Sequence, residues 1–524
     1  MPLDSRTTIR WKLWLWPAAG LLGAAVVGLI WAWTAEAEQH QVRVVRTMLI
    51  VAPTVLLETG WLSVWLLLLS RMRWPVRLAS CAALALVLAG AVYSVRIAGV
   101  SGDTLPQLTW RWAREPGDLP LPASGRTPAA GDTLAETAGD YPQFLGPTRD
   151  GIVRGLRLAR DWVSRPPQPL WRQPIGAGWS GFAVVGDHAI TQEQRGDEEL
   201  VTCYDLRTGE VHWSHSDRER FDNPLGGLGP RATPAISAGR VFALGATGRL
   251  NAIDLATGEL LWSTNVVEDA SAVVPTYGVS ASPLVLGGEV VVSPGGSGGN
   301  SLVAYDCVSG ERKWSGGDGS PAYSSPLLAT LAGVEQILVL NGDELSSHDP
   351  LDGSVLWHHP WPGQTERVSQ PVVVSEESVF LSTGYGVGGK LFRVKADEAG
   401  GLGVELIWES LGLKAKFTNV VHRDGFLYGL DDGILACIDV GSGQRRWKGG
   451  RYGHGQIVLS GELIVILAEN GEVALVEARP DSHVEVGRFS AIEGKSWGHP
   501  ALAGRYLLVR NDREAACYEL PLED

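Results

Sequence analysis

The chain has 524 residues and a formal net charge of −14 at pH 7, because 58 acidic residues outnumber 44 basic ones. Residues 1–100 hold nine Lys and Arg against four Asp and Glu, so the negative charge belongs to the remainder. A body this acidic lacks the basic surface by which proteins bind nucleic acids, and we expect no nucleic-acid partner. The 65 glycines favour many short strands joined by tight turns, since glycine tolerates positive φ.

The cysteines and histidines form no recognisable metal or redox motif. No two of the five cysteines lie close together in the sequence, and the eleven histidines show no ligand spacing. We therefore expect no metal ligands and interpret the cysteines as small buried side chains. The cysteines are Cys81, Cys203, Cys307, Cys437 and Cys517.

Three apolar runs near the N-terminus, at about 13–33, 48–70 and 78–99, are each near the ~20 residues that a helix needs to cross a bilayer. They predict a membrane anchor of three transmembrane helices over residues 1–100. Basic residues precede the first run and fill the short second loop, which places both on the cytoplasmic side. These residues are Arg6, Arg10, Lys12, Arg71, Arg73 and Arg77.

With three crossings, everything after residue 100 lies outside the cytoplasm. We thus expect a multi-pass protein of the inner (cytoplasmic) membrane whose main domain is periplasmic or otherwise extracytoplasmic. Glu58 falls near the middle of the second run, where a charge is costly. It is interpreted as a protonated carboxyl bonded within the helices, or alternatively as an ion or partner contact.

Residues 101–140 are rich in Pro, Gly, Ala and Thr without apolar periodicity, which predicts a flexible linker. From residue 141 to 524 the chain repeats a unit that is clearest at 239–264, GRVFALGATGRLNAIDLATGELLWST. The aspartate that ends its third strand can accept hydrogen bonds from the turn amides, and the glycine supplies the left-handed position.

Related units each end at an aromatic residue of a fourth, outer strand. Their spacing of 39–52 residues matches the ~40–50 residues of a four-stranded propeller blade. The aromatics are Trp213, Trp262, Trp314, Trp357, Trp408, Trp447 and Phe489.

An eighth blade is divided between the two ends of this domain. Trp171 lies in PLWRQPI, a fourth strand without the preceding three, and the C-terminus supplies three strands without a fourth. Pairing them closes the ring and removes exposed edges. The predicted fold is an all-β, eight-bladed β-propeller with N- to C-terminal strand closure.

Each blade begins with small or polar residues before an apolar strand. Packing at the crowded axis explains the Gly, Ser and Thr at these starts, but it explains less well several larger residues. These larger residues are candidate ligand-binding residues at the propeller mouth: Trp179, Arg231, Tyr323, His454 and Trp497.

The YDLRTGEVHW-type repeat, the eightfold count and the closure resemble the PQQ-like (quinoprotein-type) β-propeller family over residues 141–524. The opening segment YPQFLGPTRDG at 141–151 looks like that of bacterial propellers of this group. The resemblance implies one of two functions. BamB-like propellers of the outer-membrane assembly machinery are non-enzymatic scaffolds. Quinoprotein dehydrogenases oxidise alcohols or sugars with pyrroloquinoline quinone (PQQ) and calcium, some of them behind N-terminal membrane helices.

The chain departs from the dehydrogenase pattern. It has no adjacent cysteines and no long insertions, and its repeated aspartates are turn residues instead of catalytic bases. These are Asp205, Asp254, Asp306, Asp349 and Asp439.

We therefore expect a non-enzymatic protein–protein interaction scaffold of the bacterial cell envelope, with envelope or exported proteins as partners, no catalytic residues and no cofactor. A PQQ-dependent dehydrogenase with calcium is the alternative if the protein is an enzyme. A small-ligand sensor is the second alternative.

Overall fold

The computed structural model describes residues 60–61, 63–68, 70, 72–122, 137, 139–363, 366–396 and 401–523. The chain divides into two compact units, Met1–Arg114 and Glu115–Asp524. In the first unit, helix α3 (Trp74–Ser94) is followed by an antiparallel hairpin of β1 (Val95–Val100) and β2 (Pro106–Trp110). Among the described residues, α3 alone is long and apolar enough to cross a membrane, with a mean hydropathy of 1.9.

The three predicted membrane segments fare differently. The third, placed at 78–99, is a helix at Trp74–Ser94 instead, and its predicted end was wrong because Val95–Val100 pairs with β2. The first segment and Glu58 lie outside the described residues, as does most of the second, of which residues 60–61 and 63–68 are helical. Three transmembrane helices are therefore not established.

The predicted linker at 101–140 stays a prediction, but part of this segment has defined structure. Residues 106–110 form β2, and Gly117 and Pro120 contact the propeller. The carbonyl of Gly117 accepts a hydrogen bond from the amide of Gly196 at 2.9 Å, and that of Pro120 accepts one from Arg195 Nη1 at 2.8 Å. These bonds fix the segment because each satisfies a polar group of the first blade.

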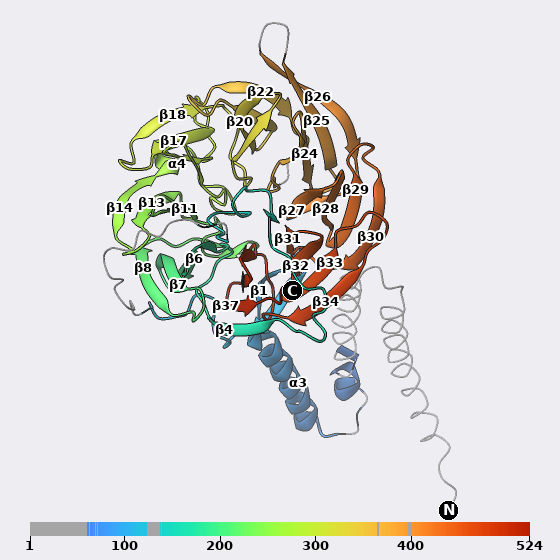
Figure 1. Ribbon diagram of the computed structural model, residues 1–524. Helices are drawn as coiled ribbons and strands as arrows, with labels where there is room; N and C mark the ends of the chain where they lie inside the picture. Colours follow the sequence, from blue (N-terminus) through green and yellow to red (C-terminus); the bar gives the residue numbers. More distant parts are fainter. Residues whose placement is uncertain are drawn as a thin grey trace, which may run out of the picture. The chain divides into compact units, whose positions relative to one another are not determined.

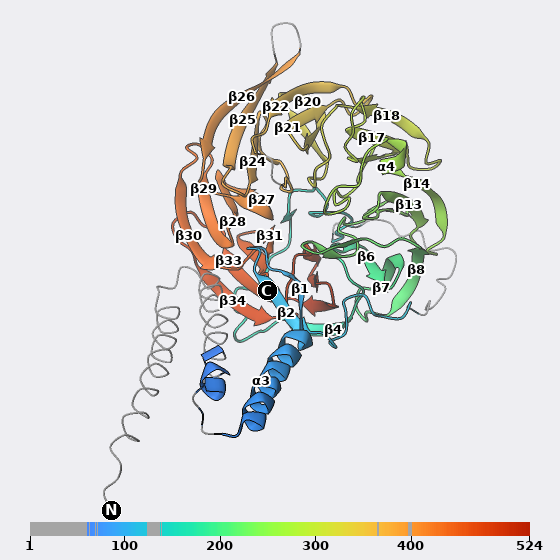
Figure 2. The ribbon, with the colours of Figure 1, turned by 180° about the vertical axis from the view of Figure 1, so that it is seen from behind.

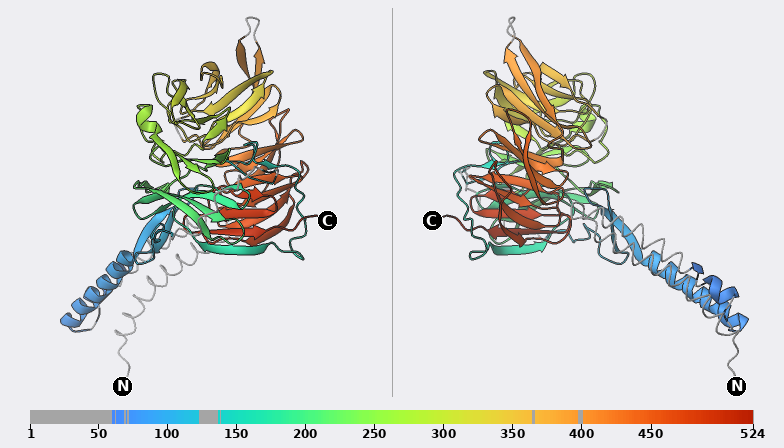
Figure 3. Two further views of the ribbon diagram at one scale, coloured as in Figure 1. Left: turned by 60° about the vertical axis from the view of Figure 1, so that its left-hand side comes forward. Right: turned by 90° about the vertical axis from the view of Figure 1, so that its right-hand side faces the viewer.

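Eight antiparallel blades surround a central axis (Figure 1) and are seen from behind in Figure 2 and from the side in Figure 3. Blades 1 to 4 consist of β5 (Ala183–Val185), β6 (His188–Arg195), β7 (Glu198–Asp205) and β8 (Val211–Asp217); β11 (Ala235–Ser237), β12 (Arg240–Leu244), β13 (Arg249–Asp254) and β14 (Leu260–Asn265); β15 (Leu284–Leu286), β16 (Glu289–Val292), β17 (Leu302–Asp306) and β18 (Arg312–Gly316); and β19 (Leu327–Leu331), β20 (Val334–Leu340), β21 (Glu344–His348) and β22 (Val355–Pro360).

Blades 5 to 8 follow the same order from the axis outward, except that blade 8 takes its outer strand from the start of the propeller. They consist of β23 (Val372–Ser375), β24 (Ser378–Thr383), β25 (Gly388–Ala396) and β26 (Leu402–Ser410); β27 (Ala415–Arg423), β28 (Phe426–Asp431), β29 (Ile434–Asp439) and β30 (Arg445–Arg451); β31 (Gln456–Ser460), β32 (Leu463–Leu467), β33 (Glu472–Glu477) and β34 (Glu485–Ser490); and β35 (Ala501–Ala503), β36 (Tyr506–Arg510), β37 (Glu514–Glu519) and β4 (Gln168–Pro174). In blade 7 the short strand β3 (Ile152–Val153) adds a fifth strand, parallel to β31.

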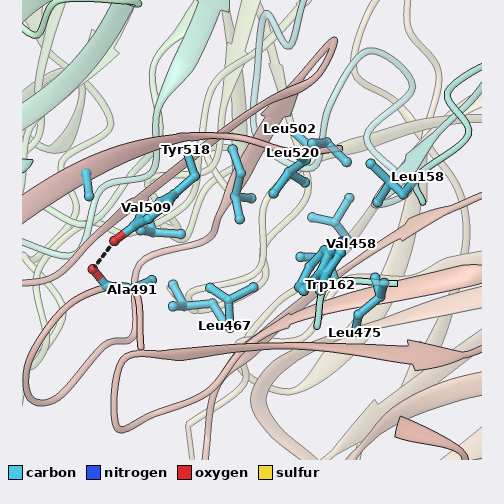
Figure 4. Close-up of a cluster of buried hydrophobic side chains, with 14 of the residues drawn as sticks. Leu158, Trp162, Val458, Leu467, Leu475, Ala491, Leu502, Val509, Tyr518 and Leu520 are labelled. Carbon is cyan, nitrogen blue, oxygen red and sulfur yellow. Dashed lines mark hydrogen bonds between the residues drawn. The ribbon is translucent and has the colours of Figure 1, made fainter. Parts of the chain in front are cut away.

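The predicted closure is confirmed by the pairing of β37 with β4, in which Cys517 lies opposite Trp171. Beneath this junction, Leu158 and Trp162 pack with apolar side chains of blades 7 and 8. Figure 4 shows this cluster, in which the Tyr518 hydroxyl donates to the Ala491 carbonyl at 2.8 Å. The two ends of the propeller sequence are therefore joined both by a strand pair and by a shared core.

The repeated turn forms as predicted. Asp205 Oδ1 accepts hydrogen bonds from the amides of Arg207 and Thr208 at 2.9 and 2.7 Å, and Gly209 has φ of 74°. The turn of one blade then receives the outer-strand tryptophan of the previous blade. A Cβ on Gly209 would lie 2.8 Å from Cδ2 of Trp171, whose Nε1 donates to the carbonyl of Leu206 at 2.9 Å.

This tryptophan contact recurs between other neighbouring blades. An indole Nε1 donates to a backbone carbonyl of the next blade's turn in four further pairs: Trp213 to Leu255, Trp262 to Cys307, Trp408 to Val440 and Trp447 to Arg479. Each bond satisfies a carbonyl at a blade interface while the ring covers the turn.

A second set of contacts joins the blades near the axis. The backbone amide at the start of one inner strand donates to the side-chain oxygen at the same position of the next blade. The bonds run from Gly181 to Thr233, Thr233 to Ser282, Ser282 to Ser325, Ser325 to Gln370, and Asn419 to Gln456, at 2.7–3.4 Å. We call this set the axial belt. The prediction that packing explains these small polar residues is incomplete, because their oxygens also satisfy buried amides.

Arg510 on β36 locks blade 8 to blade 1. Its guanidinium is 1% exposed and donates to the carbonyls of Gly176, Gly178 and Gln192 at 2.7–3.2 Å. Burial lowers the pKa of Arg510. Three carbonyls at the closing interface thus depend on one side chain.

Residues 141–151 run across the axis among the inner strands, and we call them the crossing segment. Tyr141 bridges to Val184 of blade 1, and the Gly151 carbonyl accepts from Leu459 of blade 7 at 2.8 Å. Between them, the buried Arg149 donates to the carbonyls of Ser282 and Pro283 at 3.1 and 2.8 Å. The segment spans the axis and contacts both sides of the ring.

We expect Arg510→Met to lower the free energy of unfolding by roughly 3 kcal/mol or more, because it leaves buried carbonyls without donors. The measurement is unfolding of the full-length protein in detergent, followed by intrinsic tryptophan fluorescence. Arg505→Met on the same strand pair is the matched control. Arg505 is exposed and paired with Glu519 at 2.8 Å, so its loss should cost less than about 1 kcal/mol. Equal losses for both variants would contradict the assigned role of Arg510.

Candidate functional site

All five predicted mouth residues occupy one equivalent position. Each lies two residues before the axial-belt position of its blade, at the end where the inner strands begin. We call this end the mouth, and it also carries the loops between the second and third strands, because strands alternate in direction. The mouth positions of blades 1 to 8 are Trp179, Arg231, Ser280, Tyr323, Val368, Phe417, His454 and Trp497.

Four of these side chains form a continuous series of rings, which we call the aromatic arc. Ring centroids are 5.0 Å apart for His454 and Phe417, 5.2 Å for Phe417 and Trp497, and 5.0 Å for Trp497 and Trp179. These separations are within the range of favourable aromatic pairs. The structure therefore brings Trp179, His454 and Trp497 together, and adds Phe417.

Two lysines lie over the rings of the aromatic arc. Lys495 Nζ is 4.0 Å from the Trp497 centroid and 4.9 Å from that of Trp179. Lys416 Nζ is 5.8 Å from the Phe417 centroid and 4.8 Å from that of Tyr385. Both arrangements are cation–π contacts. We call Lys416 and Lys495 the arc lysines, and burial lowers the pKa of Lys495.

The aromatic arc is held in place by hydrogen bonds of its polar atoms. Trp179 Nε1 donates to the Gly226 carbonyl at 2.7 Å, and Trp497 Nε1 donates to Glu469 Oε1 at 3.0 Å. The other oxygen of Glu469 accepts from the backbone amide of His454 at 3.0 Å. These bonds fix the ring orientations before any partner arrives, which lowers the entropic cost of binding.

Arg231 and Tyr323 occupy the mouth positions of blades 2 and 4. The Arg231 guanidinium lies 4.8 Å from the Phe221 centroid and donates to the Gly227 carbonyl of the short hairpin β9 (Asp222–Asn223) and β10 (Gly227–Leu228) at 2.9 Å. Tyr323 packs edge-on against Tyr277, with centroids 5.8 Å apart. The same hairpin accepts from Trp179 Nε1 through the Gly226 carbonyl, so it connects Arg231 to the aromatic arc.

A carboxylate lies near the tyrosines of this part of the mouth. Burial raises the pKa of Tyr277 and of Tyr385, and the carboxylate of Glu366 adds to both rises. Tyr385, at the tip of the loop between β24 and β25, is 41% exposed and has φ of 57°. Its ring faces Lys416, so it links the tyrosine group to the arc lysines.

Glu199 at the start of β7 is a buried carboxyl near the mouth. Burial raises its pKa to about 7, and Asp217 and Glu219 add to the rise, whereas Arg231 and the Ala246 amide oppose it. Glu199 is 6% exposed. It is thus a group that changes charge near neutral pH beside Arg231.

Sequence reasoning missed the arc lysines and Phe417. Phe417 was recognisable, because it occupies the same position before its inner strand as Trp179 and Trp497 do in theirs. The lysines lie one and two residues before those positions, and no pattern in the sequence indicates which rings they would meet. That any of these residues binds a ligand stays a prediction.

A calcium-bound quinone at the mouth would need oxygen ligands there. The described residues contain no group of three or more His, Cys, Asp or Glu side chains placed to hold a metal ion. Calcium requires six to eight oxygen ligands. Glu469 accepts hydrogen bonds from Trp497 and His454, and Glu366 lies near Tyr277 and Tyr385. This donor set does not fit a calcium-bound quinone.

We expect Glu199→Gln to stabilise the protein above neutral pH. The folded-state pKa of Glu199 lies above its unfolded value of 4.5, so its favourable contribution exists below pH 4.5 and is lost as pH rises through 7. The variant should gain about 3 kcal/mol in unfolding free energy at pH 8 and little at pH 5. Glu198→Gln, on the neighbouring half-buried residue, is the matched control for the substitution itself. A pH-independent effect of Glu199→Gln would contradict the assignment.

The repeats are similar to those of known proteins. Residues 197–449 match the model of a family described as outer membrane protein assembly factor BamB. Quinohemoprotein alcohol dehydrogenase ADH-IIG of Pseudomonas putida is 32% identical over 150 residues, which are 28% of this chain and 20% of that protein. Quinohemoprotein alcohol dehydrogenase of Comamonas testosteroni is 30% identical over 122 residues, 22% of this chain and 16% of that one. The match thus spans a fifth or less of these curated relatives.

Among solved structures, BamB from Moraxella catarrhalis is similar at 15% identity and a TM-score of 0.49, over 68% of this chain and 99% of that chain. A europium-containing methanol dehydrogenase is similar at 12% identity and a TM-score of 0.42, over 72% of this chain and 90% of that chain. The resemblance predicted from the repeats is confirmed, because residues 197–449 of this eight-bladed propeller carry the PQQ-like repeats of the family described as outer membrane protein assembly factor BamB.

Proposed function

We propose that the protein is a membrane-anchored, non-enzymatic scaffold whose mouth binds another protein. The observation that carries this proposal is the aromatic arc with its arc lysines, held rigid by internal hydrogen bonds. Rings and cations of this kind dominate the energy of protein interfaces, and fixed orientations favour binding. The polar atoms that a catalyst would need are instead used to hold the rings.

The rest of the propeller supports a binding role. The mouth side chains are placed on loops of a rigid frame, an arrangement common in binding proteins. The net charge of −14 argues against nucleic acid and favours a protein partner, which we expect to be an envelope or exported polypeptide.

The proposed location follows from the N-terminal part of the chain. Residues 1–100 would anchor the protein by three transmembrane helices, residues 101–140 would connect them to the propeller at 141–524, and the propeller would face the periplasm. Support comes from α3, whose 21 residues suffice to cross a bilayer core, and from Arg73 and Arg77 at its start.

A photo-crosslinking residue in place of Tyr385 should capture a specific envelope protein in native membranes, because this ring is exposed at the mouth. The measurement is mass spectrometry of the crosslinked product. A crosslinker in place of Leu351 is the control, since this residue is 86% exposed in a turn at the opposite end. Recovery of the same proteins from both positions, or of none from Tyr385, would contradict a mouth-binding scaffold.

The alternative is a PQQ-dependent dehydrogenase, which the partial sequence similarity to quinohemoprotein alcohol dehydrogenases favours. Titration of the full-length protein in detergent with PQQ and calcium, followed by absorbance and calorimetry, separates the two. Because the mouth donor set does not fit a calcium-bound quinone, we expect no saturable binding and no dye reduction with alcohols or sugars. Saturable binding with turnover would replace the scaffold by the dehydrogenase.

A further inference from the structure

We propose that the hairpin of β1 and β2 binds the surface of the lipid bilayer, with one apolar face among the headgroups and the upper acyl chains. This inference rests on the proposed membrane location and goes beyond the scaffold function. The juxtaposition that carries it is an exposed apolar hairpin face that directly continues an apolar helix without buried residues.

The strand register makes one face of the hairpin apolar. Ile97 lies opposite Leu108, and the next pair on the same side is Val95 and Trp110, because residues two apart in a strand point to one face. Trp112 stacks on Trp110 with ring centroids 5.1 Å apart and extends this face. We call Ile97, Leu108, Trp110 and Trp112 the apolar hairpin face, and all four are more than half exposed.

The hairpin is not part of a larger sheet. In the part of the chain that the structure describes, β1 and β2 pair only with each other. An isolated two-stranded hairpin is only marginally stable in water, and a contiguous exposed apolar patch marks an interaction site. The apolar hairpin face therefore gains stability from an apolar surface outside the hairpin.

The connection to α3 identifies that surface as lipid. β1 begins at the residue after α3, and the Ser94 carbonyl at the end of α3 accepts from the amide of Arg111 at 2.8 Å (Figure 2). Arg111 Nε also donates to the Tyr93 carbonyl at 2.8 Å, and its guanidinium lies 4.6 Å from the Tyr93 ring centroid. Both strands are thus fixed to the last turn of α3. If α3 crosses the bilayer, the hairpin lies where the bilayer meets water.

The aromatic residues favour lipid over a protein as the occupant. Trp74 is exposed at the first residue of α3 and Tyr93 in its last turn, where Trp110 and Trp112 follow on the hairpin. The 21 residues of α3 span ~30 Å, which is the thickness of a bilayer core. Trp and Tyr are enriched at both membrane–water interfaces. A protein partner of the hairpin alone would not require an exposed ring at the far end of α3.

The backbone limits how deep the hairpin can lie. The outer edge of each strand has no strand partner among the described residues, and unpaired backbone groups are not tolerated in the hydrocarbon core. The opposite face carries the polar pair Arg96 and Thr109. At the interface, water reaches these groups while apolar side chains enter the bilayer by ~5–10 Å. The hairpin therefore lies along the interface and does not cross the bilayer.

The test compares one fluorophore at three leucine positions of the full-length protein in phosphatidylcholine vesicles. Leu86→Cys in α3, Leu108→Cys in the hairpin and Leu351→Cys in a propeller turn are each labelled with nitrobenzoxadiazole. All three leucines are more than half exposed. The background is Cys81→Ala, which should itself take up no label because the other four cysteines are buried. The quenchers are lipids with a nitroxide at a shallow or a deep acyl position, and iodide in the water.

We expect the shallow nitroxide to quench the label at Leu108 at least about twofold more than the deep nitroxide does, and iodide to quench it at least about twofold less than at Leu351. The deep nitroxide should be the stronger lipid quencher at Leu86, and neither lipid should quench at Leu351. Ile97→Cys, at the cross-strand partner of Leu108, should repeat the Leu108 result from the other strand. Thermal unfolding of each variant establishes that it is folded.

Three results would overturn the inference. Iodide quenching at Leu108 equal to that at Leu351 would place the hairpin face in water, and protection from all three quenchers would show that protein covers it. Stronger quenching by the deep than by the shallow nitroxide would place it in the hydrocarbon core. In each case, lipid quenching at Leu86 leaves the membrane anchor and the scaffold function standing. If Leu86 is not quenched by lipid either, the proposed membrane location is also wrong.

Discussion

The contact between the outer-strand tryptophan of one blade and the turn of the next holds the propeller together. At the junction of blades 1 and 2, Asp254 accepts a hydrogen bond from a turn amide, and Gly258 has no Cβ that would collide with the indole ring of Trp213. Trp213 Nε1 then donates to the carbonyl of Leu255. Each part requires the other two: a side chain at Gly258 would collide with the ring, and without Asp254 the carbonyl would lose its position. The repeat motif is therefore one interface divided between two blades.

This interface fixes the rotation between blades and so determines what meets at the axis. Because successive blades are related in the same way, equivalent residues reach the same level, and the axial belt can run from Thr233 to Ser282 to Ser325. Two residues earlier, the same relation brings Trp179 and Trp497 within 5.0 Å, although they come from opposite ends of the propeller sequence. The mouth is thus assembled by the same contacts that stabilise the fold.

The features that could be predicted from the sequence are those whose residue pattern lies within a single repeat. The turn aspartates, the turn glycines and the unpaired strand around Trp171 are local patterns, and together they gave the eight blades and their closure. Hydropathy could not place the end of α3, because the apolar residues of Val95–Val100 are suited to a helix as well as to a strand, and the pairing with β2 decides. The crossing segment has no periodicity, so its position across the axis depends on contacts with distant blades.

The same distinction applies to the candidate site. Trp179, Arg231, Tyr323, His454 and Trp497 stood out because large residues interrupt a series of small ones, and this signal is present within each repeat. The arc lysines gave no such signal. Lys495 contacts the ring of Trp179 in blade 1, and Lys416 contacts the ring of Tyr385 in a loop of blade 5. Neither contact lies within a single repeat, so the sequence of one repeat does not indicate it.

Closing the propeller does not require large rings at the mouth. Blades 3 and 5 place Ser280 and Val368 at this position, and their inner strands still join the axial belt through Ser282 and Gln370. Rings at Phe417, Trp497 and Trp179 therefore exceed what packing demands. Trp497, which is half-buried and held by its hydrogen bond to Glu469, also loses side-chain freedom without full contact with a core. Because these rings cost side-chain freedom and the fold does not require them, they favour the binding role that we propose for the mouth.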